Sequence, residues 1–169
     1  MKKWKKVLAV GMAAATVFGT TVCAWGAQQK TAYTFTPDAG KAVQISVGAD
    51  AQTTLGALGA AKESKTLANC ANGGNDLVYC YDNFDVYTLR TGKKKVIVQS
   101  VVLKNDQVAT EEGVKLGQTP KDVKKAYPDA VEENGLYTVT LGNSRITIDC
   151  GPGNDKVVDI AYDFVEDGR

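Results

Sequence analysis

The sequence of 169 residues contains no histidine. Histidine is the usual general base near neutral pH and the usual partner of a serine or cysteine nucleophile. Its absence excludes a hydrolytic triad in its common form. The spacing of the four cysteines matches no zinc-binding pattern, so we expect no metal site and no cofactor. We therefore predict that the protein is not an enzyme.

Adjacent carboxylates are the remaining candidates for acid–base chemistry. Two such pairs occur, Glu111-Glu112 and Glu132-Glu133. Neighbouring side chains point apart in extended structure and both pairs fall in expected loops, so we interpret them as solvated charges. The glycine-rich turns at Gly73-Gly74 and Gly151-Pro152-Gly153 do not open predicted helices, so they do not indicate a phosphate-binding loop.

Positive charge is concentrated at the start of the chain. Met1 to Lys6 contains four lysines, and Val7 to Val22 is an uncharged, mostly apolar stretch. This pattern is typical of a secretory signal, which we assign to residues 1–26. Without it, 16 basic and 19 acidic side chains remain, a net charge of −3. Beyond Lys93-Lys94-Lys95 there is no basic run, so the protein lacks the charge pattern of a nucleic-acid binder.

The cleavage point decides between a free and an anchored protein. Ala24-Trp25-Gly26 has the small-x-small pattern of an ordinary signal peptidase site. Lipidation of Cys23 is the less favoured alternative, because Val22 is bulky where a lipobox requires a small residue. We predict a secreted or cell-surface protein, which contacts a membrane only if Cys23 is lipidated or the signal is retained.

Export gives the remaining cysteines a possible structural role, because thiols outside the cytosol tend to form disulfides. Cys70 and Cys80 bracket a turn-forming stretch that would let the two sulfurs meet. Pairing of Cys80 with Cys150 is the alternative, and the sequence does not choose between them.

Two segments of the chain resemble each other. Ile45 to Asp50 leads into a predicted helix over Ala51 to Leu58, and Val114 to Thr119 leads into one over Pro120 to Tyr127. Each segment reads as the end of an apolar strand, a glycine turn, an N-cap and a short helix. Asp50 and Thr119 are the predicted N-caps, and Asp122 completes a capping box with Thr119.

Short alternating runs separated by turn residues follow each helix and predict strands. They are Leu77 to Asp82, Phe84 to Leu89 and Val96 to Leu103, then Leu136 to Leu141, Ser144 to Asp149 and Val157 to Phe164. We therefore predict an α+β fold of two tandem repeats, each a short helix plus a three-stranded antiparallel meander. The repeats span residues 44–104 and 105–169 of one compact domain, after an N-terminal segment or linker over 27–43.

Three segments carry a family resemblance: Ile45 to Gly48, Asn69 to Tyr81, and Glu111 to Gly117 followed by a short helix. They resemble uncharacterised exported proteins of Gram-positive gut bacteria, whose fold is similar to the β-lactamase inhibitory protein and, more distantly, to small outer-membrane lipoproteins of the barrel-assembly machinery. The resemblance covers about Tyr33 to Phe164. It implies a continuous curved sheet with both helices on one face, and an open concave face that binds a partner.

Four tyrosines are candidates for that open face. Tyr79 and Tyr81 alternate on one side of a predicted strand, while Val78 and Cys80 point to the other. If the aliphatic side packs under the helices, the open face is lined by tyrosines, where they provide contact area at low entropic cost. The candidates are Tyr79, Tyr81, Tyr87 and Tyr137. The alternative is that they form cross-strand pairs that only stabilise the sheet.

These observations predict a non-catalytic extracellular module that binds a protein, with an inhibitor of an extracellular enzyme as one form. No inhibitory loop is matched residue by residue, so the resemblance does not extend to inhibition of a β-lactamase. A structural or envelope-assembly surface protein is one alternative. Small-ligand or glycan binding is another, and it would require a deep cleft.

Overall fold

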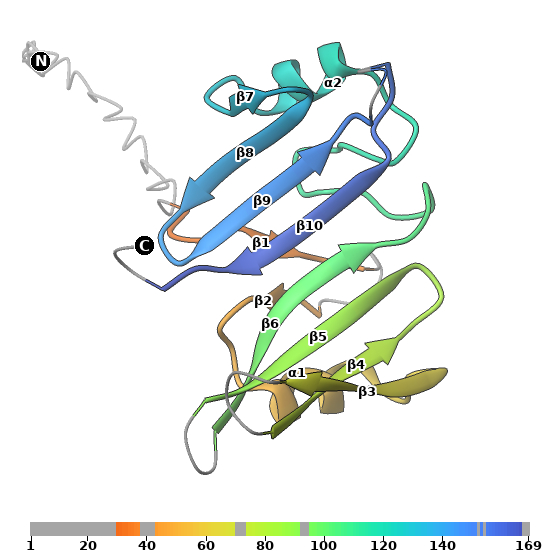
Figure 1. Ribbon diagram of the computed structural model, residues 1–169, viewed down its shortest axis with the longest axis vertical. Helices are drawn as coiled ribbons and strands as arrows, with labels where there is room; N and C mark the ends of the chain where they lie inside the picture. Colours follow the sequence, from red (N-terminus) through yellow and green to blue (C-terminus); the bar gives the residue numbers. More distant parts are fainter. Residues whose placement is uncertain are drawn as a thin grey trace, which may run out of the picture.

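The computed structural model describes residues 30–37, 43–69, 74–91, 95–151, 153 and 155–166. Its elements are ten strands and two helices within these residues (Figure 1). They are β1 (Thr34–Phe35), β2 (Ile45–Ser46), α1 (Ala51–Leu58), β3 (Glu63–Asn69), β4 (Gly74–Cys80), β5 (Phe84–Thr91), β6 (Lys95–Leu103), α2 (Pro120–Ala126), β7 (Val131–Glu133), β8 (Leu136–Leu141), β9 (Ser144–Asp149) and β10 (Asp159–Phe164).

Eight strands form one curved antiparallel sheet in the order β3-β4-β5-β6-β10-β9-β8-β7. Along the chain, α1 and four strands are followed by α2 and four strands. The two groups of strands meet where β6 pairs with β10, with Val101 opposite Tyr162. β3 and β7 are the two edges of the sheet.

Both helices begin at the predicted N-caps. Asp50 Oδ1 accepts a hydrogen bond from the Thr53 backbone N–H at 2.8 Å. The Thr119 hydroxyl and backbone N–H both donate to Asp122 Oδ2, at 2.7 and 2.9 Å, and Pro120 opens α2. These contacts use donors that a helix start or its cap would otherwise leave unsatisfied. The predicted helix boundaries are confirmed within one residue.

The turn before each helix is tied to a strand in the same way. Gly48 N donates to Val98 O at 2.7 Å, and Val98 N returns a bond to Ala49 O at 2.9 Å. Gly117 N and Val157 O are joined at 2.8 Å, as are Val157 N and Gln118 O. Gly48 and Gly117 have φ of 81° and 84°, in the left-handed region that glycine occupies without strain.

The core lies against one side of the sheet. Burial alternates along β5 and β9, as the sequence pattern predicts for strands with one buried face. Val86, Val101, Tyr162 and Ile146 occupy one cross-strand row at its centre and are almost completely buried. Ala51 of α1 and Val123 of α2 belong to the same hydrophobic cluster.

The segment before β2 takes part in this core, although the sequence suggested a linker over residues 27–43. Phe35 in β1 is completely buried, and its ring lies 5.3 Å from that of Phe84 and 5.8 Å from that of Tyr162. The Tyr33 N–H donates to the Ser144 hydroxyl at 2.6 Å. Described residues 30–37 are therefore packed against both halves of the sheet.

The prediction of three strands per half is wrong, because each half has four. The missed strands are the edges, β3 and β7. Glu63 to Leu67 of β3 are all exposed, and so are the three residues of β7. An edge strand exposed on both sides has no buried positions, so it lacks the alternation by which strands are recognised in a sequence. The predicted strands over 136–141 and 144–149 are confirmed with unchanged boundaries.

Candidate functional site

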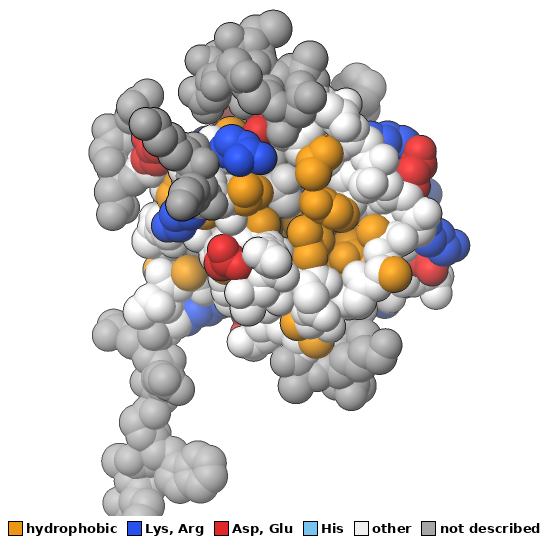
Figure 2. Space-filling model, turned by 90° about the horizontal axis from the view of Figure 1, so that it is seen from below, with side chains coloured by type: hydrophobic (Ala, Val, Ile, Leu, Met, Phe, Trp, Pro, Cys, Tyr) orange, Lys and Arg blue, Asp and Glu red, His pale blue; other side chains and the backbone are white. Residues whose placement is uncertain are grey.

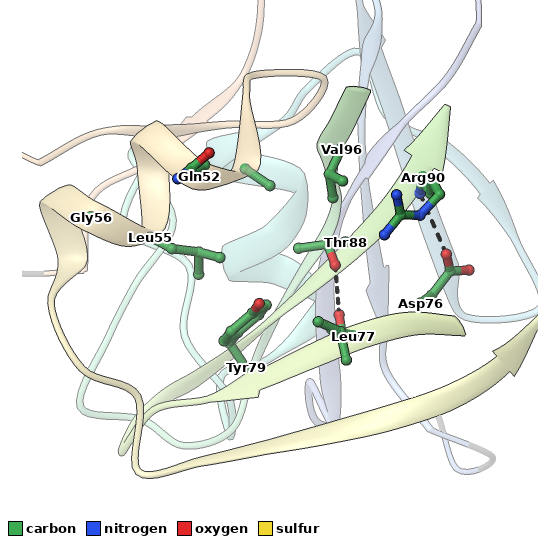
Figure 3. Close-up of a pocket in the computed structure, with 10 residues that line it drawn as sticks. Gln52, Leu55, Gly56, Asp76, Leu77, Tyr79, Thr88, Arg90 and Val96 are labelled. Carbon is green, nitrogen blue, oxygen red and sulfur yellow. Dashed lines mark hydrogen bonds between the residues drawn. The ribbon is translucent and has the colours of Figure 1, made fainter. Parts of the chain in front are cut away.

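A groove between α1 and the sheet is the most distinctive surface feature in the described part of the chain. It has a volume of about 580 Å³. Viewed from the end of the molecule that holds α1 and β3, hydrophobic side chains gather at the middle of the surface, with charged side chains around them (Figure 2). The groove is lined by Ala51, Gln52, Leu55 and Gly56 of α1, Asp76, Leu77 and Tyr79 of β4, Thr88 and Arg90 of β5, and Val96 of β6 (Figure 3).

The walls of the groove are apolar side chains that the core only half covers. Leu55, Leu77, Tyr79 and Val96 are each partly exposed. Leu55 points from α1 toward the strands, and Tyr79 and Leu77 face it from β4 (Figure 3). Gly56 also lines the groove, and a Cβ added there would meet nothing within 4 Å.

Polar groups in the groove are satisfied within the protein or lie at its end. The Thr88 hydroxyl is buried and donates to Leu77 O at 3.0 Å. The Arg90 backbone N–H donates to Asp76 Oδ1 at 3.4 Å, which places both charged side chains together at one end (Figure 3). The middle of the groove therefore offers apolar contact, and its end offers one charge of each sign.

The corresponding position beside α2 carries a charged side chain. When Asp50 is aligned with Thr119 as the N-cap, Leu55 corresponds to Lys124. The Lys124 ammonium lies 5.7 Å from the centre of the Tyr137 ring and 2.7 Å from Glu132 Oε2. Burial raises the pKa of the Tyr137 phenol above its ordinary value. The apolar side chain that Leu55 contributes in the first half is thus a lysine paired with Glu132 in the second.

The open face of the sheet, away from the core, carries aromatic, polar and charged side chains side by side. One cross-strand row there contains Tyr87, Ser100, Asp163 and Arg145. Arg145 Nη2 lies 3.7 Å from Asp163 Oδ2, and nearby Lys104 Nζ lies 3.1 Å from Asp85 Oδ1. These opposite charges offset each other, so this row offers neither an apolar patch nor a field of one sign.

The four predicted tyrosines do not share this open face. In the β4–β5 register, Tyr79 lies opposite buried Val86, while Tyr87 lies opposite Val78. Neighbouring rows point to opposite faces, so Tyr79 faces the core side and only Tyr87 faces the open side. The aliphatic face was expected beneath the helices. Both faces of β4 are apolar, however, and α1, which packs against β6, lies on the side that holds Tyr79 and Tyr81.

The other two tyrosines are also on the core side, which corrects the prediction for them. The Tyr81 ring stacks on Phe84 at 4.8 Å, and its hydroxyl donates to Gly59 O at 3.2 Å. Tyr137 is buried in the hydrophobic cluster. Of the four candidates, Tyr79 forms a wall of the groove, and Tyr81 lines a smaller cavity beside Leu58 and Phe84.

The predicted disulfide at Cys80 is not present. Cys80 and Cys150 are free, buried thiols, which also removes the alternative pairing between them. Cys70 lies outside the described residues, as does Cys23. Asn69, the residue before Cys70, pairs with Gly74 at one end of the β3–β4 ladder, whereas Cys80 pairs with Glu63 at the other end. Burial raises the pKa of both free thiols, so they are protonated and poorly nucleophilic.

The paired carboxylates are not uniformly solvated. Lys30 Nζ binds Glu111 Oε2 at 2.8 Å and Glu112 Oε1 at 2.5 Å, and the Tyr127 hydroxyl donates to Glu112 Oε2 at 2.5 Å. Glu112 is half-buried, so the prediction of a solvated charge is wrong for it. Glu132 and Glu133 lie in β7 rather than in a loop. Within the described ranges, no three histidine, cysteine, aspartate or glutamate side chains come together to hold a metal ion.

Sequence reasoning missed most of the groove. Gln52, Leu55, Thr88, Arg90 and Val96 were not singled out, because a groove depends on how far α1 stands from the strands. One local signal was available. Gly56 lies inside a helix, where glycine costs about 0.5 to 1 kcal/mol relative to alanine, so it marks a position where a side chain is absent.

No protein family matches the chain, and neither a curated protein nor a solved structure shows significant similarity to it. Neither helix in the described residues is long and apolar enough to cross a membrane.

Proposed function

We propose that this protein is a non-catalytic binding module, exported as its first 26 residues predict, that recognises a protein partner through the α1 groove. The observation that carries the proposal is the set of half-exposed apolar side chains at the groove walls, Leu55, Leu77, Tyr79 and Val96. A protein that exposes such side chains together in a concave site is suited to bury a partner's apolar side chains there.

The distribution of polar groups favours a protein partner. Apolar side chains form the middle of the groove, while Gln52, Asp76 and Arg90 lie toward its margin. Protein interfaces have this arrangement, with an apolar centre and a polar rim. A partner segment could place two or three apolar side chains against Leu55 and Tyr79 and form hydrogen bonds at the rim.

We further propose that the two halves are tandem repeats and that only the first has kept an open groove. The matching bonds from Gly48 and Gly117 to Val98 and Val157 support the repeat. The second half has Lys124 at the position equivalent to Leu55, which supports the divergence. The resemblance to inhibitory and assembly proteins that use a concave sheet face is a separate hypothesis, and the mixed charges on that face give it less support.

Selection of displayed random peptides on the mature chain from Gln28 onward tests the proposal. The key variant is Leu55→Lys, which introduces the residue found at the corresponding position of the second half. We expect peptides with two or three apolar anchors to be enriched on the native protein. Burial of a leucine contributes about 1.5 to 3 kcal/mol, so their affinity for Leu55→Lys should fall at least about tenfold.

Val158→Lys is the matched control, because Val158 is also an exposed hydrophobic residue but does not line the groove. It should retain the selected peptides, and circular dichroism should show that both variants are folded. Equal binding to Leu55→Lys, or no enrichment of apolar peptides on the native protein, would contradict a peptide-binding groove.

A small apolar ligand is the second candidate, favoured by one observation. The volume of about 580 Å³ is within the range of small-molecule sites, about 300 to 1,000 Å³. Mass spectrometry of organic extracts from the purified protein would separate the two candidates. A bound apolar compound present in the native protein and absent from Leu55→Lys would favour the small ligand.

A further inference from the structure

The outer edge of the sheet at β3 is an unusual exposed surface. β3 pairs with β4 through all seven of its residues without a bulge, and it is the terminal strand of the sheet. Side chains from Glu63 to Leu67 are exposed, and Leu67 is 43% exposed although it is a large hydrophobic residue. A long, regular edge presents backbone N–H and C=O groups that another strand can pair with.

The two edges of the sheet differ in how open they are to pairing. β7 at the opposite edge has three residues, whereas β3 has seven. Proline and bulges are common protections of an edge strand, and β3 has neither. Its charged side chains, Glu63 and Lys65, are of opposite sign and two residues apart. Such an edge can pair with the same edge of a second copy, because each charged side chain can face one of opposite sign.

We propose that β3 pairs antiparallel with β3 of a second copy of this chain, about a two-fold axis at Ser64. In this register residue 63 lies opposite residue 65 of the other copy, so Glu63 faces Lys65 on both sides of the axis. The residues just before β3 extend this ladder, with Ala61 opposite exposed Leu67 and Lys62 opposite Thr66. Opposite charges and apolar side chains in direct cross-strand pairs stabilise such a ladder. The dimer has an isologous interface, as most homodimers do.

Charge selects this register over its neighbours. An axis at Glu63 would place the two Glu63 carboxylates opposite each other, and an axis at Lys65 would do the same with two ammonium groups. An axis at Thr66 would place Lys65 opposite Leu67. An axis midway between two residues would place side chains of opposite faces across from each other. The axis at Ser64 alone joins unlike charges at both central pairs.

The side chains that the register joins are already close within one chain. Lys65 Nζ lies 3.3 Å from Glu63 Oε2 of the same strand. In the dimer the two pairs become a ring of four alternating charges. The odd-numbered residues of β3 lie on the open face and the even-numbered ones on the core side, since Ser64 pairs with Tyr79. The α1 grooves of both copies would then open on the same side of a continuous sheet.

Sedimentation velocity on the mature chain tests the interface. We suggest concentrations from about 10 to 500 µM, because a single strand pair buries less than the roughly 1,200 Å² of stable complexes. The native protein should shift from monomer to dimer across this range. Glu63→Lys places two lysines opposite each other and Lys65→Glu places two glutamates opposite each other, so each variant alone should remain monomeric.

The decisive sample is an equimolar mixture of these two monomeric variants. In a mixed dimer the lysine introduced at position 63 of one chain would face the glutamate introduced at position 65 of the other. The unchanged Lys65 of the first chain would face the unchanged Glu63 of the second, so the dimer should return. Within each variant chain the two charges remain alike, so no contact inside one copy can produce this rescue. Lys156→Glu, at an exposed site outside β3, changes the net charge as Lys65→Glu does and should dimerise like the native protein.

Three results would overturn the proposal. One is a native protein that stays monomeric throughout the concentration range. Another is a dimer that both single variants retain, which would place the interface elsewhere. The third is a mixture that remains monomeric although the native protein dimerises, which would show that β3 residues contribute without the Glu63–Lys65 pairing.

Discussion

At the scale of single residues, Phe35 is the anchor that joins the start of the described chain to the core. Its ring is completely buried and contacts Phe84 from the first half and Tyr162 from the second. Gly142 belongs to the same arrangement, because a side chain there would come within 2.5 Å of Thr31 O. The N-terminal segment is therefore attached to the sheet by a few close contacts rather than by extended strand pairing.

Replacement of Phe35 tests that role. Phe35→Ala should lower the free energy of unfolding by about 3 to 5 kcal/mol, because it removes a buried ring and leaves a cavity. Urea denaturation followed by circular dichroism measures the change. Thr36→Ala, at an exposed neighbouring position, should change it by less than about 0.5 kcal/mol. A loss below about 1 kcal/mol at Phe35 would mean that the segment does not pack in the core in solution.

At the scale of elements, the two short helices depend on their caps. Helices of eight and seven residues are too short to be stable by themselves in water, so caps and packing determine them. The pKa of Asp50 is lowered by hydrogen bonds from the Thr53 backbone and side chain. The pKa of Asp122 is lowered by the bonds from Thr119. Both caps thus work best with an ionised carboxylate.

The helix caps make stability depend on acid pH in a defined direction. Folded pKa values below the ordinary 3.8 mean that the contribution is complete above that value and is lost as pH falls through the folded pKa. The double variant Asp50→Asn with Asp122→Asn keeps capping groups that do not titrate. Between about pH 4 and pH 2 it should lose less stability than the native protein.

Urea midpoints measured from about pH 7 to pH 2 give this comparison. Asp129→Asn is the control, because Asp129 is exposed and caps neither helix. It should follow the native protein. If the double variant and the native protein lost stability in parallel over the whole range, the caps would not be the source of the acid sensitivity.

At the scale of the whole molecule, the two halves share one core. Three residue pairs join β6 to β10, and the row from Val86 through Val101 and Tyr162 to Ile146 crosses that junction. Gly48 of the first half lies close to the Phe164 ring, where any added side chain would come within 2.7 Å. Neither half could keep its buried face covered after separation from the other.

A shared core predicts cooperative unfolding. Native-state hydrogen exchange should give the same free energy of opening for the amides of Val86 and Val101 in the first half and Ile146 and Tyr162 in the second. This value should equal the global free energy of unfolding from urea denaturation. Two distinct values, one for each half, would contradict the shared core and would indicate two independently folding units.

The sequence by itself determined the local elements of this protein. The N-caps at Asp50 and Thr119 and the strands over 136–141 and 144–149 were predicted, because capping and one-sided burial leave patterns in neighbouring residues. The edge strands were missed, because exposure on both sides removes the alternation.

Only the tertiary structure decided which face of β4 lies toward α1 and where the groove lies. Leu77, Val78, Tyr79 and Cys80 are apolar or weakly polar on both faces, so the strand period does not determine which side meets α1. The groove brings together residues of α1, β4, β5 and β6, and its width depends on how closely the helix approaches the strands. Neither property is encoded in a short stretch of chain, because both arise from packing between elements distant in the sequence.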